Sequence, residues 1–245
     1  KNILCILKHQ SCGKKKLMKI SKIFIACDTT RLSKIKKIIK QSKNKKLKIG
    51  YKFGLEFLNS KYGRKFISNL KNEITFGDYK ISDIPNTCAS AIKSVKDLNF
   101  NYITIHVNCG LNALKAAKKA AGKVKLIGVT TLTSLDNKSL KDMGYIGNIN
   151  KVVLKQAKLA RKANLDAIVC SPKEVKLVKK VFKKEIITPG IRFNSKLNDQ
   201  KRVLTPKQAY KNGSDWLVIG RPITKGNIKE NIKKLIDHLN QWLKV

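Results

Sequence analysis

Three charged residues stand close together in the segment GDYKISDIPNT: Asp78, Lys80 and Asp83. If Asp78 and Lys80 lie on one strand, their side chains point the same way, because alternate residues of a strand share a face. A carboxylate and an ammonium about 4 Å apart near a surface attract each other by roughly 4 kcal/mol before desolvation is counted. Neighbouring carboxylates favour the charged form of a lysine, so the pattern predicts an ammonium that can deliver a proton. A solvated ion-pair network is the alternative that these charges alone leave open.

The elements that must position these residues form a regular series. From Lys19 onward, short apolar or β-branched runs alternate with helix-like stretches, a pattern typical of βα units around a parallel sheet. Eight units in 245 residues predict a single α/β domain, a closed (β/α)8 or TIM barrel, whose usual size is roughly 250 residues. The predicted strands are residues 23–28, 47–54, 74–80, 102–107, 124–130, 166–170, 185–189 and 215–220.

Helices are predicted between these strands, and a separate extension is predicted before the first strand. The clearest amphipathic segments are residues 32–39, 113–121, 152–163 and 228–242. Residues 1–18 lack the apolar core and cleavage site of a signal peptide, so we interpret them as an N-terminal extension, disordered or not native. The barrel domain is predicted to span residues 19–245.

The active site is expected at the C-terminal ends of the strands, where the loops of such a barrel form a mouth. The polar residues at these ends, which we expect to face the mouth, are Asp28, Lys52, Asp78, Lys80, His106, Thr130, Ser171, Arg192 and Arg221. We predict a structural role for His106, because no second metal-ligating side chain stands at a suitable spacing. The long irregular stretch 192–205 predicts a loop that closes over the site.

Two arginines predict a phosphate site at the same mouth. The chain has 54 Lys and Arg residues, and only six of them are Arg, yet Arg192 and Arg221 both follow predicted strands. A guanidinium offers a rigid fork of donors that suits two phosphate oxygens. Backbone amides around Gly220, at the start of the following helix, would add further donors to an anion.

Composition excludes several other classes of protein. A net charge of +39 could indicate nucleic-acid binding, but the lysines are spread along the whole chain, and no zinc-finger, RNA-binding or basic-helix motif accompanies them. No apolar run approaches the roughly 18 residues that a membrane span needs. The six cysteines form no CxxC pair, which favours free thiols and a cytoplasmic location.

The segment that holds the three charged residues also carries a family resemblance. Residues 78–87 complete the pattern DxKxxDIPNT, which resembles the signature of the orotidine 5'-phosphate decarboxylase family, and the resemblance continues over nearly all of residues 22–225. The further matching segments are IACD with Asp28, YKFGLEF with Lys52, TIHVNCG with His106, GVTTLTS with Thr133, VCS with Ser171, TPGIR with Arg192, DQKRVLTP with Gln200, and VIGRPIT with Gly220 and Arg221.

The resemblance implies a reaction that needs no cofactor and no metal. Orotidine 5'-monophosphate (OMP) would lose CO2 from C6 and become UMP, a step of pyrimidine biosynthesis. Lys80 would stabilise the C6 carbanion and then donate its proton to it. Asp78 would lie beside the substrate carboxylate, where it disfavours the bound ground state. Asp83 would hold Lys80 from the other subunit of a homodimer.

The resemblance also implies the residues that bind the substrate. Asp28 and Lys52 would bind the ribose hydroxyls, assisted by Thr87 of the partner subunit, and Thr133 would contact the pyrimidine edge. Gln200 would close over the phosphate together with Arg192, Gly220 and Arg221. Lys48 is a second candidate for the ribose lysine, because LKIG also fits the strand pattern, but the spacing from Lys52 to Asp78 fits better.

Two other functions remain as alternatives. A magnesium-dependent sugar-phosphate decarboxylase or aldolase of the same barrel superfamily would share the D-x-K-x-x-D pattern. We do not expect such an enzyme to carry IPNT after the second aspartate, or the loop with Gln200. A basic nucleic-acid-binding protein is the remote alternative, and it depends on net charge alone.

Overall fold

Alternation of buried strands with amphipathic helices closes the chain into a barrel. The computed structural model describes residues 20–193 and 203–240. Within these ranges, eight strands pair in chain order, each parallel to its neighbours, and β8 returns to pair with β1. They are β1 (Ser21–Ala26), β2 (Leu47–Gly54), β3 (Ile74–Ile81), β4 (Tyr102–His106), β5 (Lys125–Val129), β6 (Ala167–Val169), β7 (Glu185–Thr188) and β8 (Trp216–Ile219).

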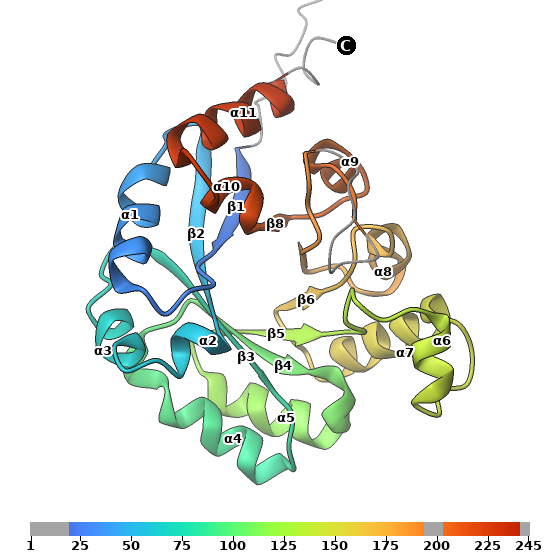
Figure 1. Ribbon diagram of the computed structural model, residues 1–245. Helices are drawn as coiled ribbons and strands as arrows, with labels where there is room; N and C mark the ends of the chain where they lie inside the picture. The colour runs from blue at the N-terminus through green and yellow to red at the C-terminus, as the bar shows by residue number, and fades with distance from the viewer. Residues whose placement is uncertain (1–19, 194–202, 241–245) are drawn as a thin grey trace, which may run out of the picture.

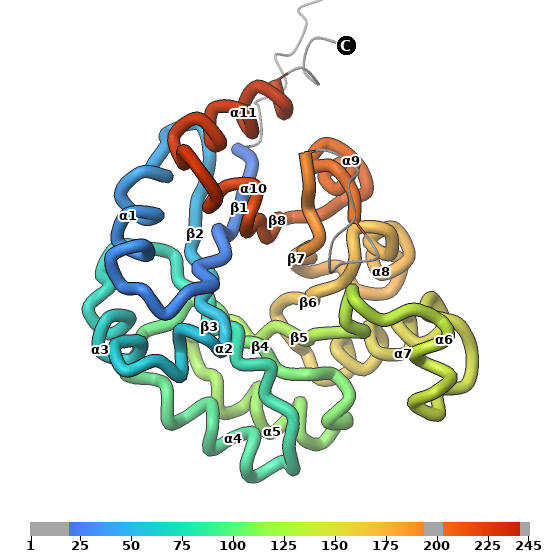
Figure 2. Tube along the Cα trace, in the orientation of Figure 1, coloured from blue at the N-terminus to red at the C-terminus, as the bar shows by residue number. Residues whose placement is uncertain are grey.

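Helices surround the barrel on its outside (Figures 1 and 2). The described helices are α1 (Leu32–Ser42), α2 (Leu55–Leu58), α3 (Gly63–Ser68), α4 (Pro85–Ser94), α5 (Gly110–Ala121), α6 (Asn137–Asp142), α7 (Ile149–Lys162), α8 (Val175–Val181), α9 (Pro206–Lys211), α10 (Arg221–Thr224) and α11 (Ile228–Asn240). Two 3-10 segments, η1 (Lys96–Leu98) and η2 (Val107–Cys109), complete the series. None of the described helices is both long and apolar enough to cross a membrane.

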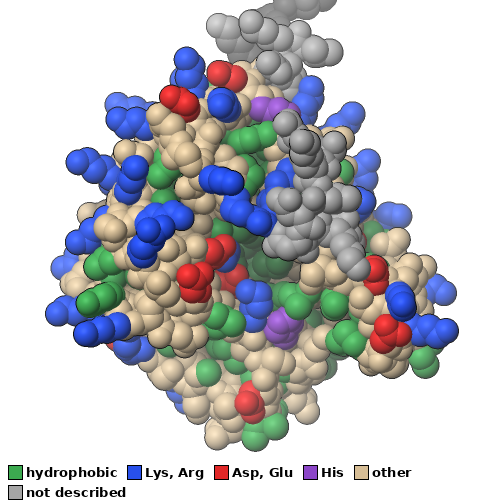
Figure 3. Space-filling model, in the orientation of Figure 1, with side chains coloured by type: hydrophobic (Ala, Val, Ile, Leu, Met, Phe, Trp, Pro, Cys, Tyr) green, Lys and Arg blue, Asp and Glu red, His purple; other side chains and the backbone are tan. Residues whose placement is uncertain are grey.

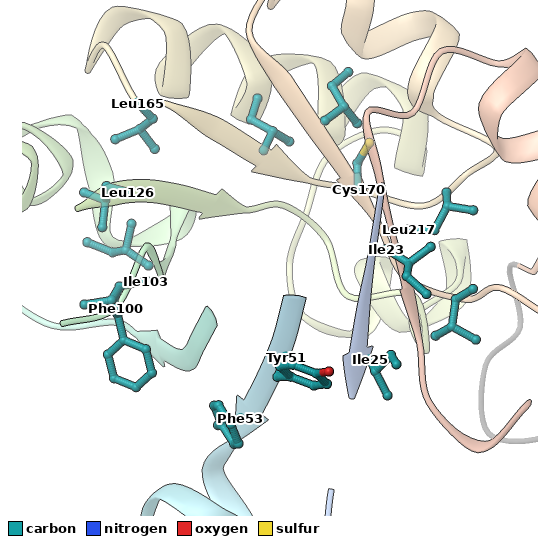
Figure 4. Close-up of a cluster of buried hydrophobic side chains, with 14 of the residues drawn as sticks. Ile23, Ile25, Tyr51, Phe53, Phe100, Ile103, Leu126, Leu165, Cys170 and Leu217 are labelled. Atoms are coloured by element: carbon teal, nitrogen blue, oxygen red, sulfur yellow. The ribbon is translucent and has the colours of Figure 1, made fainter. Parts of the chain in front are cut away.

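Strand alternation divides the buried side chains into two layers. Side chains that point outward, such as Ile25, Phe53 and Ile103, pack against the helices, and Figure 4 shows part of this layer. Side chains that point inward fill the barrel, where the rings of Phe24 and Trp216 stack with centroids 4.2 Å apart. Consecutive residues of β1 and β8 are buried on both faces, as a barrel with a packed interior and an outer layer of helices requires.

One glycine makes room for the aromatic layer inside the barrel. A Cβ at Gly50 would lie 2.6 Å from the Phe24 ring and 3.0 Å from the Ile74 carbonyl oxygen. Real Cβ atoms do not approach other atoms this closely, so only glycine fits here while Phe24 keeps its position. The alternation Lys48, Gly50, Lys52 along β2 therefore combines one small inward residue with two long ones.

The predicted barrel and the eight strands are confirmed, with corrections at the ends of the elements. β1 begins and ends two residues earlier than predicted, whereas β2 has the predicted bounds. The helices at residues 32–39 and 113–121 are longer than predicted, and the connection between β2 and β3 contains two short helices, α2 and α3. The proposed extension 1–18, the centre of the closing loop and residues 241–245 lie outside the described residues.

Candidate active site

A row of alternating charges lies at the C-terminal mouth of the barrel. Lys80 Nζ is 2.8 Å from Asp78 Oδ2, Lys52 Nζ is 3.1 Å from the same oxygen, and Lys52 Nζ is 3.3 Å from Asp28 Oδ1. Figure 3 shows acidic and basic side chains together around a hollow near the centre of this face. Two carboxylates and two ammonium groups thus form one connected network. Within it, Asp78 contacts two ammonium groups and Lys52 contacts two carboxylates.

Burial and the charges of neighbouring groups shift the pKa values of Asp78 and Lys52 in opposite directions. Burial alone would raise the pKa of Asp78, but the charges of Lys52 and Lys80 outweigh it and lower that pKa from its ordinary 3.8. Burial alone would lower the pKa of Lys52, but the charges of Asp78 and Asp28 outweigh it and raise that pKa. Asp78 is therefore an anion, and Lys52 a cation, at neutral pH.

An irregular backbone brings Lys80 to Asp78. Gly77 pairs with Ile103 and Ile81 pairs with Ile105, so four steps along β3 match two steps along β4. Lys80 has a φ of 51°, in the left-handed region, which costs a residue other than glycine roughly 1 to 3 kcal/mol. Asp78 and Lys80 meet as predicted, but the prediction that regular strand alternation brings them together was wrong: a bulge places the lysine.

Thr104 on β4 joins this bulge to the Asp78 carboxylate. Its fully buried hydroxyl donates to Asp78 Oδ1 at 3.1 Å and accepts from the Lys80 backbone N–H at 2.8 Å. The Asp78 carboxylate, only 7% exposed, is thus oriented on one oxygen by Thr104 and on the other by two lysines. The resemblance did not single out Thr104, although a polar residue at the inward position of the run YITIH could have indicated it.

The charged row opens into a pocket of about 520 Å³, a size typical of small-molecule sites. Asp28, Lys52, Asp78, Lys80, Thr133, Arg192, Gly220 and Arg221 all line it, on a floor that includes Ala26, Phe76, Val129 and Val218. Lys48 instead lies near the start of β2, at the opposite end of the barrel. Of the two candidate lysines on β2, Lys52 is therefore the one at this mouth.

Three of the polar residues predicted to face the mouth do not line this pocket. Thr130 is buried and donates to the Val169 carbonyl oxygen, and Ser171 is fully buried beside Glu174. The third residue is His106.

His106 lies close enough to the charged row that the charge of Lys80 affects its pKa. Burial lowers the pKa of His106, and the charge of Lys80 lowers it further, against a smaller opposite effect of Asp78. His106 is therefore neutral at pH 7.

Thr131 lines the pocket although it was not predicted to do so. Its backbone N–H and its hydroxyl both donate to Gln156 Oε1, at 2.9 and 3.1 Å. Gln156 Nε2 in turn donates to Asn108 Oδ1 at 2.7 Å. The sequence signal was Gln156 itself, a polar residue on the buried face of α7.

Asp83 and Thr87 lie away from the charged row of their own chain. Asp83 is exposed on the loop after β3 and accepts from the Ile84 backbone N–H at 2.7 Å. Thr87 is exposed in the first turn of α4, and neither residue is among those that line the pocket. Gln200 lies outside the described residues. Among the described residues, no group of three or more His, Cys, Asp or Glu side chains is arranged to hold a metal ion.

Known proteins resemble this chain in sequence and in structure. A sequence model of the orotidine 5'-phosphate decarboxylase / HUMPS family matches residues 21–235. Orotidine 5'-phosphate decarboxylase of Wolbachia sp. subsp. Brugia malayi (strain TRS) is 42% identical over 191 residues, covering 76% of this chain and 84% of the relative. The enzyme of the same name from Erythrobacter litoralis (strain HTCC2594) is 40% identical over 220 residues, covering 88% and 97%. The crystal structure of orotidine 5'-phosphate decarboxylase from Lactobacillus acidophilus has a TM-score of 0.76 and 30% identity, and the match covers 90% of this chain and 99% of that one.

Proposed function

The chain belongs to the orotidine 5'-phosphate decarboxylase / HUMPS family, and from that premise we propose that it converts OMP into UMP and CO2 through Lys80. Together with the relatives named orotidine 5'-phosphate decarboxylase, at 40 to 42% identity, the family membership makes the chain a carboxy-lyase, and these names support a role in pyrimidine biosynthesis. The observation that carries the proposed mechanism is the contact between Lys80 Nζ and Asp78 Oδ2, at 2.8 Å, in the wall of the pocket.

Lys80 performs two steps in this mechanism. When the bond between C6 and the carboxyl carbon breaks, its electron pair stays on C6 and CO2 leaves. The Lys80 ammonium stabilises the negative charge that develops on C6, as preorganised charges do in other active sites. One N–H proton of Lys80 then moves to C6 and forms UMP, and solvent restores the proton to the lysine.

Asp78 supplies the counter-charge that makes this arrangement selective for the transition state. Its carboxylate lies beside Lys80 and would face the carboxylate of the bound substrate. Two neighbouring anions repel each other, and the repulsion ends when the substrate carboxylate leaves as neutral CO2. An interaction that is more favourable in the transition state than in the bound ground state lowers the barrier, whereas one that is equally favourable in both states does not.

The other pocket residues hold the parts of the substrate that do not react. Asp28 and Lys52, already connected to Asp78 through the charged row, bind the ribose hydroxyls, and Thr133 contacts the pyrimidine edge. Arg192, Arg221 and the backbone near Gly220 bind the phosphate. The phosphate contacts lie far from C6, but the binding energy that they provide orients C6 against Lys80.

We propose that the active unit is a homodimer that shares its sites. Asp83 and Thr87 lie outside the pocket of their own chain, and Asp83 is followed by Ile84, which is 66% exposed. Asp83 has an expected catalytic role and Thr87 an expected role in binding the ribose, yet both are exposed and lie outside the pocket of their own chain, which supports a site shared with a second subunit. In the dimer, Asp83 and Thr87 would complete the site of the partner.

Mixing two inactive variants tests the shared site. We expect Lys80→Ala and Asp83→Ala each to lose decarboxylation of OMP, and their co-expression to restore about one quarter of wild-type activity. Random pairing makes about half of the dimers hybrid, and each hybrid has one intact site of two. Co-expression of Lys80→Ala with Asp78→Ala is the matched control, because no hybrid of these two has an intact site. Equal activity in both mixtures would contradict the shared site.

Thr104 offers a test of the bulge that positions Lys80. Thr104→Val keeps the volume but removes the hydroxyl that contacts Asp78 and the Lys80 backbone N–H. We expect kcat for OMP to fall by about 10- to 100-fold with little change in KM, because one lost hydrogen bond that positions charged groups costs about 1.5 to 3 kcal/mol. Thr104→Ser keeps the hydroxyl and should retain nearly all activity. A valine variant with wild-type kcat would show that Thr104 is not needed for positioning.

The magnesium-dependent sugar-phosphate enzymes remain the alternative within the same barrel superfamily. The family model covers more than one activity by its name, but the curated relatives cited above, at 40 to 42% identity, are named orotidine 5'-phosphate decarboxylase. Their names support OMP as the substrate. Binding to nucleic acid, which net charge alone suggested, is not needed to explain any feature of this site.

A further inference from the structure

A second pocket lies at the opposite, N-terminal end of the barrel. It has a volume of about 730 Å³ and lies near the start of several strands. Lys48 on β2, Lys96 on η1, Lys123 before β5 and Lys125 on β5 line it, together with Tyr102 and Trp216. We call it the basal pocket. Its volume lies within the range of roughly 300 to 1,000 Å³ that is typical of sites for small ligands.

Positive charge in the basal pocket is only partly balanced. Lys125 Nζ is 2.9 Å from Glu185 Oε2, and the same carboxylate also accepts from the Tyr102 hydroxyl at 3.0 Å. Lys48, Lys96 and Lys123 are exposed and form no ion pair with any of the described residues. None of the described residues that line the pocket is acidic. Of the four lysines that line the basal pocket, only Lys125 is therefore paired with a carboxylate among the described residues.

The basal pocket is separated from the active site by the aromatic layer inside the barrel. Phe24 stacks on Trp216, and its ring centroid lies 5.1 Å from that of Phe76 and 5.3 Å from that of Tyr102. These four buried residues occupy the barrel interior between the two ends. A ligand in the basal pocket would therefore bind independently of the substrate pocket, and the proposal goes beyond the decarboxylase function.

We propose that the basal pocket binds a compact polyanion with two or more adjacent phosphate groups, such as a triphosphate chain. Lysine binds phosphate as a mobile point charge, and three lysines around one hollow can each meet a different phosphate group. A chain of phosphates carries several negative charges on one compact molecule, which matches several lysines around one pocket better than a single carboxylate or phosphate does. The concave shape favours a compact ligand over a nucleic-acid duplex, which requires a more extended surface.

Calorimetric titration of the full-length protein with inorganic triphosphate tests this proposal. We expect one site per chain in the wild type. We expect Lys48→Gln, Lys96→Gln and Lys123→Gln, combined in one variant, to weaken binding by about tenfold or more. The matched control combines Lys36→Gln, Lys37→Gln and Lys40→Gln on the exposed side of α1, which changes the net charge equally.

The outcomes of this titration separate the basal pocket from two other sources of binding. Weakening by the basal variant, with less than about twofold change in the α1 variant, supports the proposal. Absence of saturable binding to the wild type, or equal weakening in both triple variants, would overturn it, since equal weakening indicates diffuse attraction to net charge. Loss of the same site in Arg221→Ala would also overturn it, because that result places the triphosphate in the substrate pocket.

Discussion

Replacing Lys80 with alanine is expected to lower kcat for the decarboxylation of OMP by at least about 10⁴-fold. The variant loses the charge that stabilises the C6 carbanion, and such charges contribute about 10²- to 10³-fold. It also loses the proton donor, and general acids contribute about 10²- to 10⁴-fold. The measurement is the formation of UMP by the purified variant, followed over a time long enough to detect that small rate.

Two further variants separate catalysis from folding. Lys80 is about one third exposed, and Lys52 still neutralises Asp78 when Lys80 is absent, so the alanine variant should fold and give a circular dichroism spectrum like that of the wild type. Lys80→Arg keeps the positive charge, but its guanidinium does not release a proton near neutral pH, and it should remain strongly impaired. Lys158→Ala, on the exposed side of α7, should keep full activity. A Lys80→Ala variant with kcat within tenfold of the wild type would contradict the mechanism.

Replacing Arg221 with alanine is expected to lower kcat/KM for OMP by about 10²- to 10⁴-fold. Arg221 lines the same pocket as Lys80 but begins the helix that follows β8. A forked contact of a guanidinium with phosphate makes two charge-assisted hydrogen bonds, each worth about 1.5 to 3 kcal/mol. Because binding energy at the phosphate also orients the reacting carbon, kcat should fall as well as substrate affinity. Steady-state kinetics of the purified variant measures both.

Conservative and remote substitutions provide the controls for Arg221. Arg221→Lys keeps the charge but not the fork, and we expect an intermediate loss. Arg161→Ala removes an exposed arginine from α7 and should leave kcat/KM unchanged. A loss in the Arg161 variant equal to that in Arg221→Ala would show that the effect comes from overall charge and not from a phosphate site.

The barrel could be predicted from the sequence because the pattern that produces it, strand runs alternating with amphipathic helices, is local and repeats along the chain. The run IFIACD and the seven that follow it alternate with amphipathic helices, and a closed parallel barrel is the arrangement that buries eight such units. The mouth could be predicted as well, since the residues at the C-terminal ends of parallel strands meet there. Asp28, Lys52 and Asp78 come from three strands and lie in one charged row.

The contacts that fix the geometry of the site could not be predicted from local patterns. The left-handed backbone at Lys80 depends on the register between β3 and β4, and register is a property of paired strands that no single segment contains. The inward position of Thr104 could be predicted from the run YITIH, but its contacts with Asp78 and the Lys80 backbone N–H depend on how β3 and β4 pair. Thr130 and Thr131 are neighbours in the sequence directly after β5, and only Thr131 lines the pocket.

The decisive measurement is the formation of UMP from OMP by the purified wild-type protein in the presence of excess metal chelator. We expect OMP to be converted into equal amounts of UMP and CO2, at a rate that the chelator does not change. If no UMP forms, or if the chelator stops the reaction and magnesium restores it, the proposed mechanism is wrong, and the second result would point to the metal-dependent sugar-phosphate enzymes of the same superfamily.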